Sequence, residues 1–340
     1  MKRFILLSTL FVLFACDSDQ DKAGRFFLKG NEAMNKGEHQ EAIRLYSEAI
    51  AKDAQYKEAW NNRGVANYRA KRYVEAINDY TQVLLQIDPE FVDARRNRVN
   101  AYLDAGRFDK AMEDLGELEN FYPDSAFVDF TRGLVYHEMK EFESSIASFE
   151  DARLKSDKDA EILINIANGY FMLKDMEPAI NLLQEAISLN AEEPNIYNTL
   201  ALIEISKAKP DYAVALQNVN KALKLESNNP FFFNNRAFIY LMTDELMKAQ
   251  NDLRLAIMGA PENAWAYRNR GILLYKREDY AAAIRNFQLA EDYDAKVPLM
   301  HRYWAQALLA QGKESEACEV AKRAVDNLSQ VEGLKNLPCL

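Results

Sequence analysis

The chain has 340 residues, of which 49% are hydrophobic and 28% are charged, so it can bury a core and does not have the composition of a disordered protein. Its formal net charge of −10 repels the phosphate backbone of nucleic acids, and no basic stripe in the sequence offsets that charge. The three cysteines and three histidines have no metal-ligand spacing. We therefore expect no metal, no cofactor and no nucleic-acid partner.

The chain begins with a segment typical of export. Lys2 and Arg3 precede an apolar run at 4–14, whose eleven residues would rise only about 16 Å as a helix and are too few to cross a bilayer core. A basic start followed by a short apolar run predicts a secretory signal peptide over residues 1–15. An uncleaved membrane anchor is the alternative.

The signal ends Leu13-Phe14-Ala15-Cys16, which resembles the lipobox of bacterial lipoproteins. The resemblance implies that cleavage leaves Cys16 lipidated and holds the chain at a bacterial membrane. Residues 16–22 are expected to be this cysteine and a short tether. The acidic residues behind it resemble surface-export signals of outer-membrane lipoproteins, whereas Asp17 alone resembles an inner-membrane retention signal; we favour the outer membrane. An ordinary signal peptide with a coincidental cysteine remains the alternative.

Small residues recur at a nearly constant spacing through the rest of the chain. They lie 34 to 36 residues apart at nine positions: Ala42, Ala76, Ala111, Ser145, Ala179, Ala215, Ala249, Ala283 and Ala317. A second small or modest residue precedes each by twelve positions, or by fourteen in the longer sixth repeat. In most repeats a larger apolar residue follows four positions later, one helical turn along the same face. The pattern predicts nine helical hairpins.

This spacing resembles the tetratricopeptide repeat over residues 23–327. The resemblance implies an all-α fold, a right-handed superhelical solenoid of about nine helix-turn-helix repeats. A single hairpin of about 34 residues buries too little surface to be stable alone, so we expect one stacked solenoid rather than two globular domains.

The C-terminal tail at 328–340 is short for a cap. The last repeat is therefore a candidate surface for a partner, or for a second copy in a homodimer formed through the C-terminal end. Cys318 and Cys339 are possible disulfide partners, which sequence alone does not decide.

Five repeats carry an arginine just before the small residue of the first helix, and a polar residue sixteen positions later. The pairs are Arg63 with Asp79, Arg98 with Asp114, Arg132 with Ser148, Arg236 with Asp252, and Arg270 with Asn286. Where the arginine is replaced by Ile166 or Trp304, the later position is also apolar, so the two positions are predicted to touch across the hairpin. We interpret these arginines as structural ties; binding of phosphate or carboxylate is the alternative.

The position before each arginine holds an amide or a hydroxyl from the second repeat to the eighth. The residues are Asn62, Asn97, Thr131, Asn165, Thr199, Asn235 and Asn269. This series resembles the asparagine ladder of superhelical tetratricopeptide domains, which implies binding of a peptide main chain in a concave groove, since an amide both donates and accepts hydrogen bonds. The alternative is that these side chains only satisfy neighbouring groups in the stack.

The same resemblance places Phe231 and Trp265 on the groove side, either as pockets for a partner's side chains or as packing between repeats. No phosphate-binding glycine loop, activated nucleophile or isolated carboxylate pair indicates an enzyme. The sequence favours a non-enzymatic, lipid-anchored scaffold of the bacterial cell envelope that binds proteins or extended peptides. The alternative is a surface lipoprotein that binds glycans or other nutrients, but such proteins carry long insertions, and here insertions do not exceed two residues.

Overall fold

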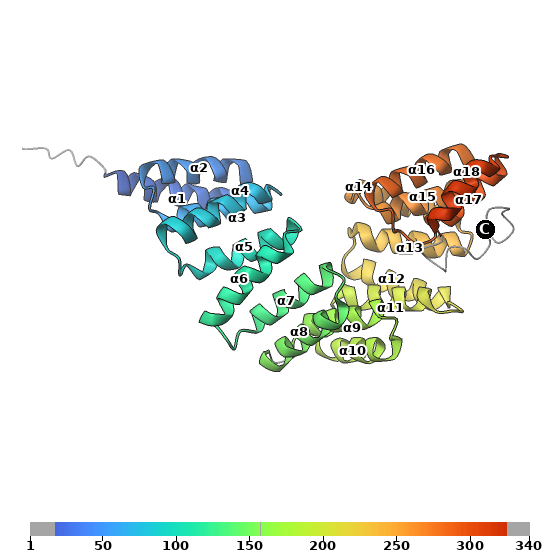
Figure 1. The fold of residues 1–340 in the computed structure, drawn as a ribbon, viewed down its shortest axis with the longest axis horizontal. Coiled ribbons are helices and arrows are strands. Elements are labelled where there is room, and N and C mark those ends of the chain that lie inside the picture. The colour runs from blue at the N-terminus through green and yellow to red at the C-terminus, as the bar shows by residue number, and fades with distance from the viewer. Residues whose placement is uncertain (1–17, 157, 325–340) are drawn as a thin grey trace, which may run out of the picture. The chain divides into compact units, whose positions relative to one another are not determined.

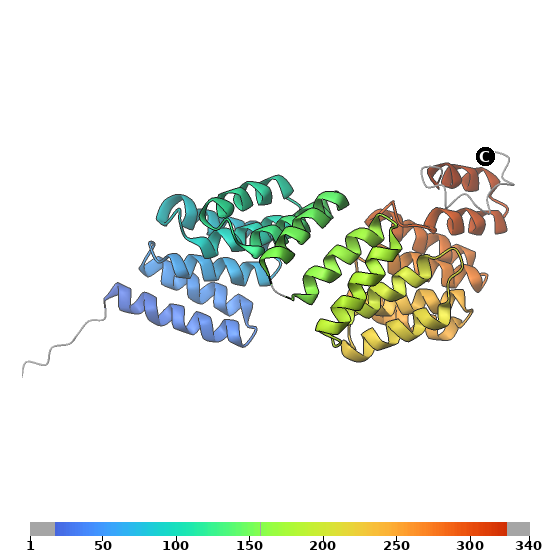
Figure 2. The same cartoon turned by 90° about the horizontal axis from the view of Figure 1, so that it is seen from below.

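The computed structural model describes residues 18–156 and 158–324, and within these ranges it contains eighteen α-helices, one short π-helix and no strand. The prediction of an all-α fold is confirmed. The helices form two compact units, which divide between Asp157 and Lys158. Figure 1 labels the helices, and Figure 2 shows how the two helices of a hairpin run beside each other within each unit.

The first unit contains four hairpins, each made of a first and a second helix. The first helices are α1 (Asp19–Asn35), α3 (Lys57–Arg69), α5 (Val92–Asp104) and α7 (Ala126–Glu138). The second helices are α2 (His39–Lys52), α4 (Tyr73–Gln82), α6 (Phe108–Phe121) and α8 (Phe142–Lys155). Helix α4 continues into the π-helical turn η1 (Val83–Ile87).

The second unit contains five hairpins of the same kind. The first helices are α9 (Ala160–Met172), α11 (Pro194–Ser206), α13 (Pro230–Met242), α15 (Ala264–Lys276) and α17 (Met300–Ala310). The second helices are α10 (Met176–Leu189), α12 (Tyr212–Leu225), α14 (Leu246–Gly259), α16 (Tyr280–Tyr293) and α18 (Glu314–Ala324).

The first helices lie closer to one another than the second helices do. Within the first unit α1 contacts α3 and α3 contacts α5, and within the second unit every first helix from α9 to α17 contacts the next. Successive second helices make no comparable contact in the part of the chain that is described. Elements on the inner side of a curved stack are the more closely spaced ones, so the first helices line the concave side of each unit. We call this side the inner face.

The small residues of the first helices make room for large side chains of the second helices. Gly30, Gly64, Gly133 and Gly271 face the rings of Tyr46, Tyr80, Phe149 and Phe287. A Cβ atom at Gly133 would lie 2.7 Å from the buried Phe149 ring. At Ala167 and Ala237 the residue sixteen positions later is a leucine, Leu183 or Leu253, so these pairs fill a similar volume to the glycine and aromatic pairs. Val99 with Leu115 is a larger pair.

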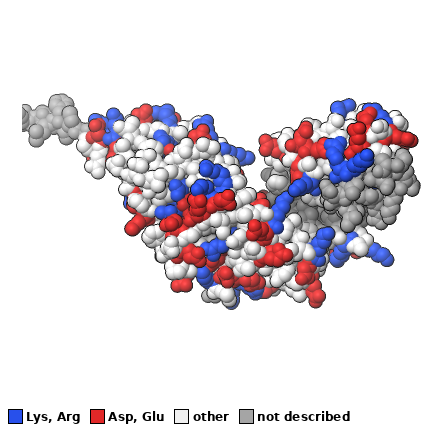
Figure 3. Space-filling model, viewed as in Figure 1, with Lys and Arg blue, Asp and Glu red and all other residues white. Residues whose placement is uncertain are grey.

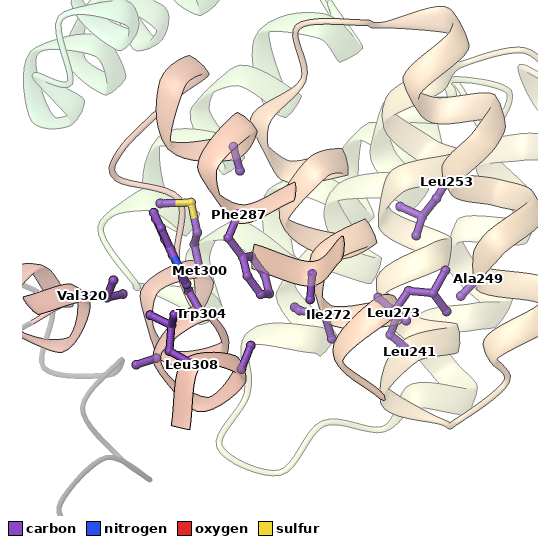
Figure 4. Packing of buried hydrophobic residues seen from close by; sticks show 14 of the residues in the cluster. Leu241, Ala249, Leu253, Ile272, Leu273, Phe287, Met300, Trp304, Leu308 and Val320 are labelled. Carbon is purple, nitrogen blue, oxygen red and sulfur yellow. The ribbon is translucent and has the colours of Figure 1, made fainter. Parts of the chain in front are cut away.

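Buried side chains continue from one hairpin to the next. In the second unit one cluster runs from Leu241 and Leu253 through Phe287 to Trp304 and Val320, and so spans α13 to α18 (Figure 4). This continuity supplies the burial that an isolated hairpin lacks.

The first helix begins earlier than the sequence predicted. Residues 16–22 were expected to be a tether, but α1 begins at Asp19. The Asp21 N–H donates to the Ser18 hydroxyl at 3.0 Å, and the Ser18 N–H donates to the Asp21 carboxylate at 3.1 Å. The tether prediction is therefore wrong for 19–22, because these residues form a capping box and a first turn in which acidic charge is favourable.

Cys16, the predicted signal peptide at 1–15 and the tail at 328–340 lie outside the described residues. Of the helices that are described, none combines the length and the apolar character needed to span a bilayer.

The shared volume within each hairpin predicts the effect of a single methyl group. Gly133→Ala should lower the free energy of unfolding by about 1–3 kcal/mol, although alanine favours helix more than glycine, because the new methyl group overlaps the Phe149 ring. Adding Phe149→Leu should restore much of the loss, since the hairpin then has the alanine and leucine pairing of Ala167 and Leu183. Urea unfolding of the single and double variants measures this effect.

The matched control for this prediction is Gly116→Ala in α6. A Cβ atom at that exposed glycine would meet nothing within 4 Å, so the substitution should stabilise the unit by about 1 kcal/mol. If Gly133→Ala proved equally stabilising, the fixed-volume interpretation would be contradicted.

Candidate functional site on the inner face

The structure brings three of the arginine and aspartate pairs together in two-pronged contacts. Arg63 Nη2 donates to Asp79 Oδ1 at 2.6 Å and its Nε to Oδ2 at 3.1 Å. Arg98 makes the same two bonds to Asp114, both at 2.7 Å, and Arg236 makes them to Asp252 at 2.7 and 2.9 Å. Each pair joins the two helices of one hairpin.

The third guanidinium nitrogen of each arginine reaches back to the preceding hairpin. The Nη1 atoms of Arg63, Arg98 and Arg236 donate to Ser47, Thr81 and Asn220, at 3.0, 3.0 and 2.9 Å. All three acceptors lie on the second helix of the previous repeat. Because the donors are used within the stack, the geometry supports a structural tie rather than a site for an external anion.

The fourth repeat differs from the prediction. Arg132 does not bond Ser148, whose hydroxyl donates to the Ser144 carbonyl at 2.9 Å. It contacts Asp129 on its own helix at 3.1 Å and Glu119 at 2.7 Å. The predicted pair is wrong because a serine cannot accept a guanidinium through two oxygens, whereas the carboxylate one turn away can. In the eighth repeat Arg270 does bond Asn286.

Burial shifts the pKa values of the paired aspartate and arginine side chains. Burial raises the pKa of Asp79, and the hydrogen bonds from Arg63 and Asn67 oppose that rise. Burial acts to lower the pKa of Arg98, but the hydrogen bonds and the negative charge of Asp114 together outweigh burial and raise the pKa above its usual value. Pairing thus favours the charged forms against burial, and loss of the arginine would leave a buried carboxylate without its counter-ion.

Most ladder residues join neighbouring first helices. Asn62, Asn97, Thr199, Asn235 and Asn269 donate to Asn31, Asn61, Asn168, Asn198 and Asn234 of the preceding repeat, over 2.8–3.0 Å. Thr131 and Asn165 instead donate to the carbonyls of Phe127 and Glu161 on their own helices. The donors are thus used within the stack, as the packing alternative predicts.

The ladder residues differ in exposure. Thr131, Thr199 and Asn269 are buried, whereas Asn62, Asn97, Asn165 and Asn235 are partly exposed on the inner face. Only the partly exposed amides can meet a ligand without a rearrangement of the stack.

Phe231 and Trp265 are presented to solvent rather than packed between repeats. Their exposed fractions are 56% and 44%. An asparagine cap fixes each at the start of its helix: Asn229 accepts the Phe231 N–H at 2.9 Å, and Asn263 accepts the Trp265 N–H at 3.1 Å. Two exposed aromatic side chains on successive first helices are the kind of anchor that dominates a protein interface.

The first unit holds a cavity of about 320 Å³ that sequence reasoning missed. Its lining includes Asp93 and Arg96 of α5 and Phe127 of α7, with the Arg96 guanidinium 4.0 Å from the centre of the Phe127 ring. Tyr122, in the turn before α7, completes one wall. A turn residue has no fixed place in the repeat pattern, so the spacing could not indicate it.

Figure 3 shows acidic and basic side chains interspersed over the face in view.

Burial raises the pKa of Glu161 at the start of α9, and the negative charges of Asp159 and Glu193 raise this pKa further. No group of three histidine, cysteine, aspartate or glutamate side chains within 18–156 and 158–324 is placed to hold a metal ion.

One inner-face cation differs from the arginine ties. Arg268 of α15 is 3% exposed, and burial lowers its pKa to about 9, with only Tyr303 acting in the other direction. Its Nη1 donates to the Pro298 carbonyl at 3.0 Å, and its Nε has no hydrogen-bond partner. The sequence analysis did not single out this residue, because burial of one residue cannot be read from a repeat.

These features define a class of protein: a stack of helical hairpins whose two helices are tied by largely buried ion pairs. Sequence models of the tetratricopeptide repeat match residues 27–90 and 249–332, and a second such model matches 67–129, so together they cover more than half of the chain. The chain belongs to the tetratricopeptide repeat family.

Similar proteins are known from sequence and from structure. Human tetratricopeptide repeat protein 13 is 32% identical over 129 residues, 38% of this chain and 14% of that protein. Hsp70-Hsp90 organizing protein 3 of Arabidopsis thaliana is 22% identical over 251 residues, 70% of this chain and 43% of that protein. The chain thus spans less than half the length of these relatives.

The fold is also similar to a solved structure. A crystal structure of the APC/C hetero-tetramer Cut9-Hcn1 matches 96% of this chain and 78% of that one, with a TM-score of 0.64 and 15% identity. At this identity the likeness shows the fold alone.

The buried ties predict a loss of stability with a defined pH dependence. Arg63→Ala should lower the free energy of unfolding by about 3 kcal/mol, because Asp79 is then buried with only Asn67 as a donor. Without Arg63 the folded-state pKa of Asp79 lies further above its unfolded value. The loss is therefore complete above the folded-state pKa and shrinks as the pH falls toward the unfolded value. Denaturant unfolding at pH 7 and near pH 4 measures both effects.

Arg44→Ala is the control for this prediction, since Arg44 and Glu41 form an exposed pair on α2. It should change stability little at either pH. Equal losses for the two variants would show that burial of the pair does not matter.

Proposed function

We propose that this protein is a non-enzymatic scaffold that binds extended segments of other proteins along the inner face of its repeats. The observation that carries the proposal is the exposure of Phe231 and Trp265 on neighbouring first helices. In the same unit the partly exposed amides of Asn165 and Asn235 lie on first helices and offer groups that pair with any main chain. An aromatic anchor combined with main-chain pairing binds a segment through a few side chains without demanding its whole sequence.

The relatives support a role in assembly. One is by name an organizing protein for Hsp70 and Hsp90, and the structure with a similar fold is by its title part of a hetero-tetramer. Both descriptions are of proteins that work with other proteins.

We further propose that lipid on Cys16 anchors the scaffold to the envelope of a bacterium, with the outer membrane favoured over the inner. The support is the apolar run at 4–14 followed by Ala15-Cys16. Cys318 of α18 is disulfide-bonded. Disulfide bonds persist in oxidising compartments such as the periplasm and the cell surface.

With the first helix beginning at Asp19, an anchor at Cys16 would hold the first repeat against the membrane. Only Asp17 and Ser18 stand between the cysteine and α1. A partner segment on the first unit would then lie close to the lipid surface.

Binding along the inner face is tested by removing its anchors. Phe231→Ala together with Trp265→Ala should reduce capture of partner proteins from envelope extracts of the native bacterium by more than tenfold, because each aromatic anchor contributes about 2 kcal/mol or more. The two side chains are exposed, so the melting temperature should stay unchanged. Quantitative mass spectrometry after cross-linking measures the recovery.

Met247→Ala is the control, because Met247 is 68% exposed on α14, a second helix of the same unit. It should leave recovery intact. Partners recovered equally well with the double variant would rule out the inner-face anchors.

The lipid anchor is tested by Cys16→Ser. The variant should incorporate no labelled fatty acid and should leave the membrane fraction, because acyl chains are what holds the protein at the bilayer. Fractionation and metabolic labelling measure both outcomes, and Cys339→Ser is the control. Unchanged membrane retention with no label in the wild-type protein would favour an uncleaved anchor instead.

A further inference from the structure

The buried guanidinium of Arg268 lies between successive first helices of the second unit. It stands 5.0 Å from the Phe238 ring of α13 and 4.9 Å from the Trp265 ring of α15. It also bonds the Pro298 carbonyl before α17. Unlike Arg63, Arg98 and Arg236, it has no carboxylate of the described residues within ion-pair distance. A buried cation without a counter-ion is costly to keep in a fold.

Asn269, the residue after Arg268, has a buried side-chain oxygen that is not hydrogen-bonded within the described chain. Asn269 is fully buried, and its Nδ2 donates to Asn234 Oδ1 at 2.8 Å, but its own Oδ1 accepts no hydrogen bond from the described residues. Arg268 Nε is a buried donor with no acceptor in that part of the chain. One helical turn thus offers an unused donor and an unused acceptor, although buried polar groups are nearly always satisfied.

The cover of this site is exposed. Trp265 overlies the guanidinium and is 44% exposed, so its ring is held on one side only. Rotation of this side chain toward solvent would open a path to Arg268 without moving a helix.

We propose that Arg268 binds an acidic side chain of an extended polypeptide segment, which lies across α13, α15 and α17. The carboxylate accepts a hydrogen bond from Arg268 Nε. Phe231 and Trp265 take an apolar side chain beside the acidic one. The proposal rests on the proposed function and names the chemistry of the bound segment.

The position of the site favours a side chain over a chain end. First helices continue on both sides of α15, with α13 before it and α17 after it. Arg302 of α17, one repeat after Arg268, also has a buried Nε without a partner. A segment can therefore run past the site in both directions, which a terminal carboxylate would not do.

The test uses full-length protein and three labelled peptides of alternating serine and leucine. One has a central glutamate and blocked ends, the second has glutamine in its place, and the third has this glutamine and a free carboxyl end. Fluorescence anisotropy should show the first binding about tenfold more tightly than the second, as expected for a hydrogen bond to a charged group in a desolvated site. The second and third should bind alike.

Arg268→Gln should reduce the tenfold preference for the glutamate peptide over the glutamine peptide to about one. Arg254→Gln removes the same charge from an exposed position on α14 and should keep the preference. Arg268→Gln should also melt no lower than the wild type, because an unpaired buried charge is removed. The wild-type protein can also be studied directly by NMR. The ¹⁵N signal of the Arg268 Nε–H group should shift when the glutamate peptide is added and should not shift when the glutamine peptide is added.

Equal binding of the first two peptides by the wild-type protein would overturn this inference and leave the proposed function standing. Tighter binding of the third peptide than of the second would replace the acidic side chain by a chain end and equally overturn it. Failure of all three to bind would contradict the proposed function as well. A lower melting temperature of Arg268→Gln with no shift of the Nε–H signal would make Arg268 a structural support of the Pro298 loop.

Discussion

The fold depends on the fixed space between the two helices of a hairpin. A glycine in the first helix faces an aromatic ring in the second, as Gly133 faces Phe149, and Ala167 and Ala237 pair with leucines. Because these pairs fill a similar volume, their hairpins have similar thickness and can stack with their buried rows in line. The stacking in turn supplies the burial that no single hairpin has, and it spaces the first helices closely enough to form an inner face.

Polar side chains on two sides of a first helix make different contacts: one side contacts second helices, and the other contacts neighbouring first helices. The guanidinium forks of Arg63, Arg98 and Arg236 bind one hairpin and reach the previous one, so they fix the rotation of successive repeats. The amide and hydroxyl donors of the ladder join first helices to each other. Side chains that the stack does not need, such as Phe231 and Trp265, are the ones free to meet a partner. The proposed binding positions are therefore the inner-face side chains that remain after those bonded within the stack are set aside.

The sequence predicts what recurs at a constant offset. The hairpins, the small residues and the pairs sixteen positions apart all follow from one packing problem solved nine times, so a single chain reveals them. Features with local causes were not predictable in the same way: the capping box at Ser18, the contact of Arg132 with Glu119, and the cavity wall at Tyr122. Arg268 belongs with them, since its acceptor at Pro298 lies in a connection that leaves the helical pattern, where Leu299 has a left-handed φ of 65°.

In the repeated tripeptide Arg-Asn-Arg, the three side chains point in three different directions and contact different neighbours. Successive residues of a helix are turned by about 100°, so two arginines two positions apart point to nearly opposite sides. Arg270 turns to its hairpin partner Asn286, Asn269 between the two arginines turns to the preceding first helix, and Arg268 turns to the inner face. The same division holds at Arg98, Asn97 and Arg96, where Arg96 stacks on Phe127 beside the cavity. Neither Arg96 nor Arg268 forms an ion pair with a carboxylate of the described residues. Arg96 is exposed to solvent, whereas Arg268 is buried, and Arg268 is the one for which we propose a counter-ion from a bound segment.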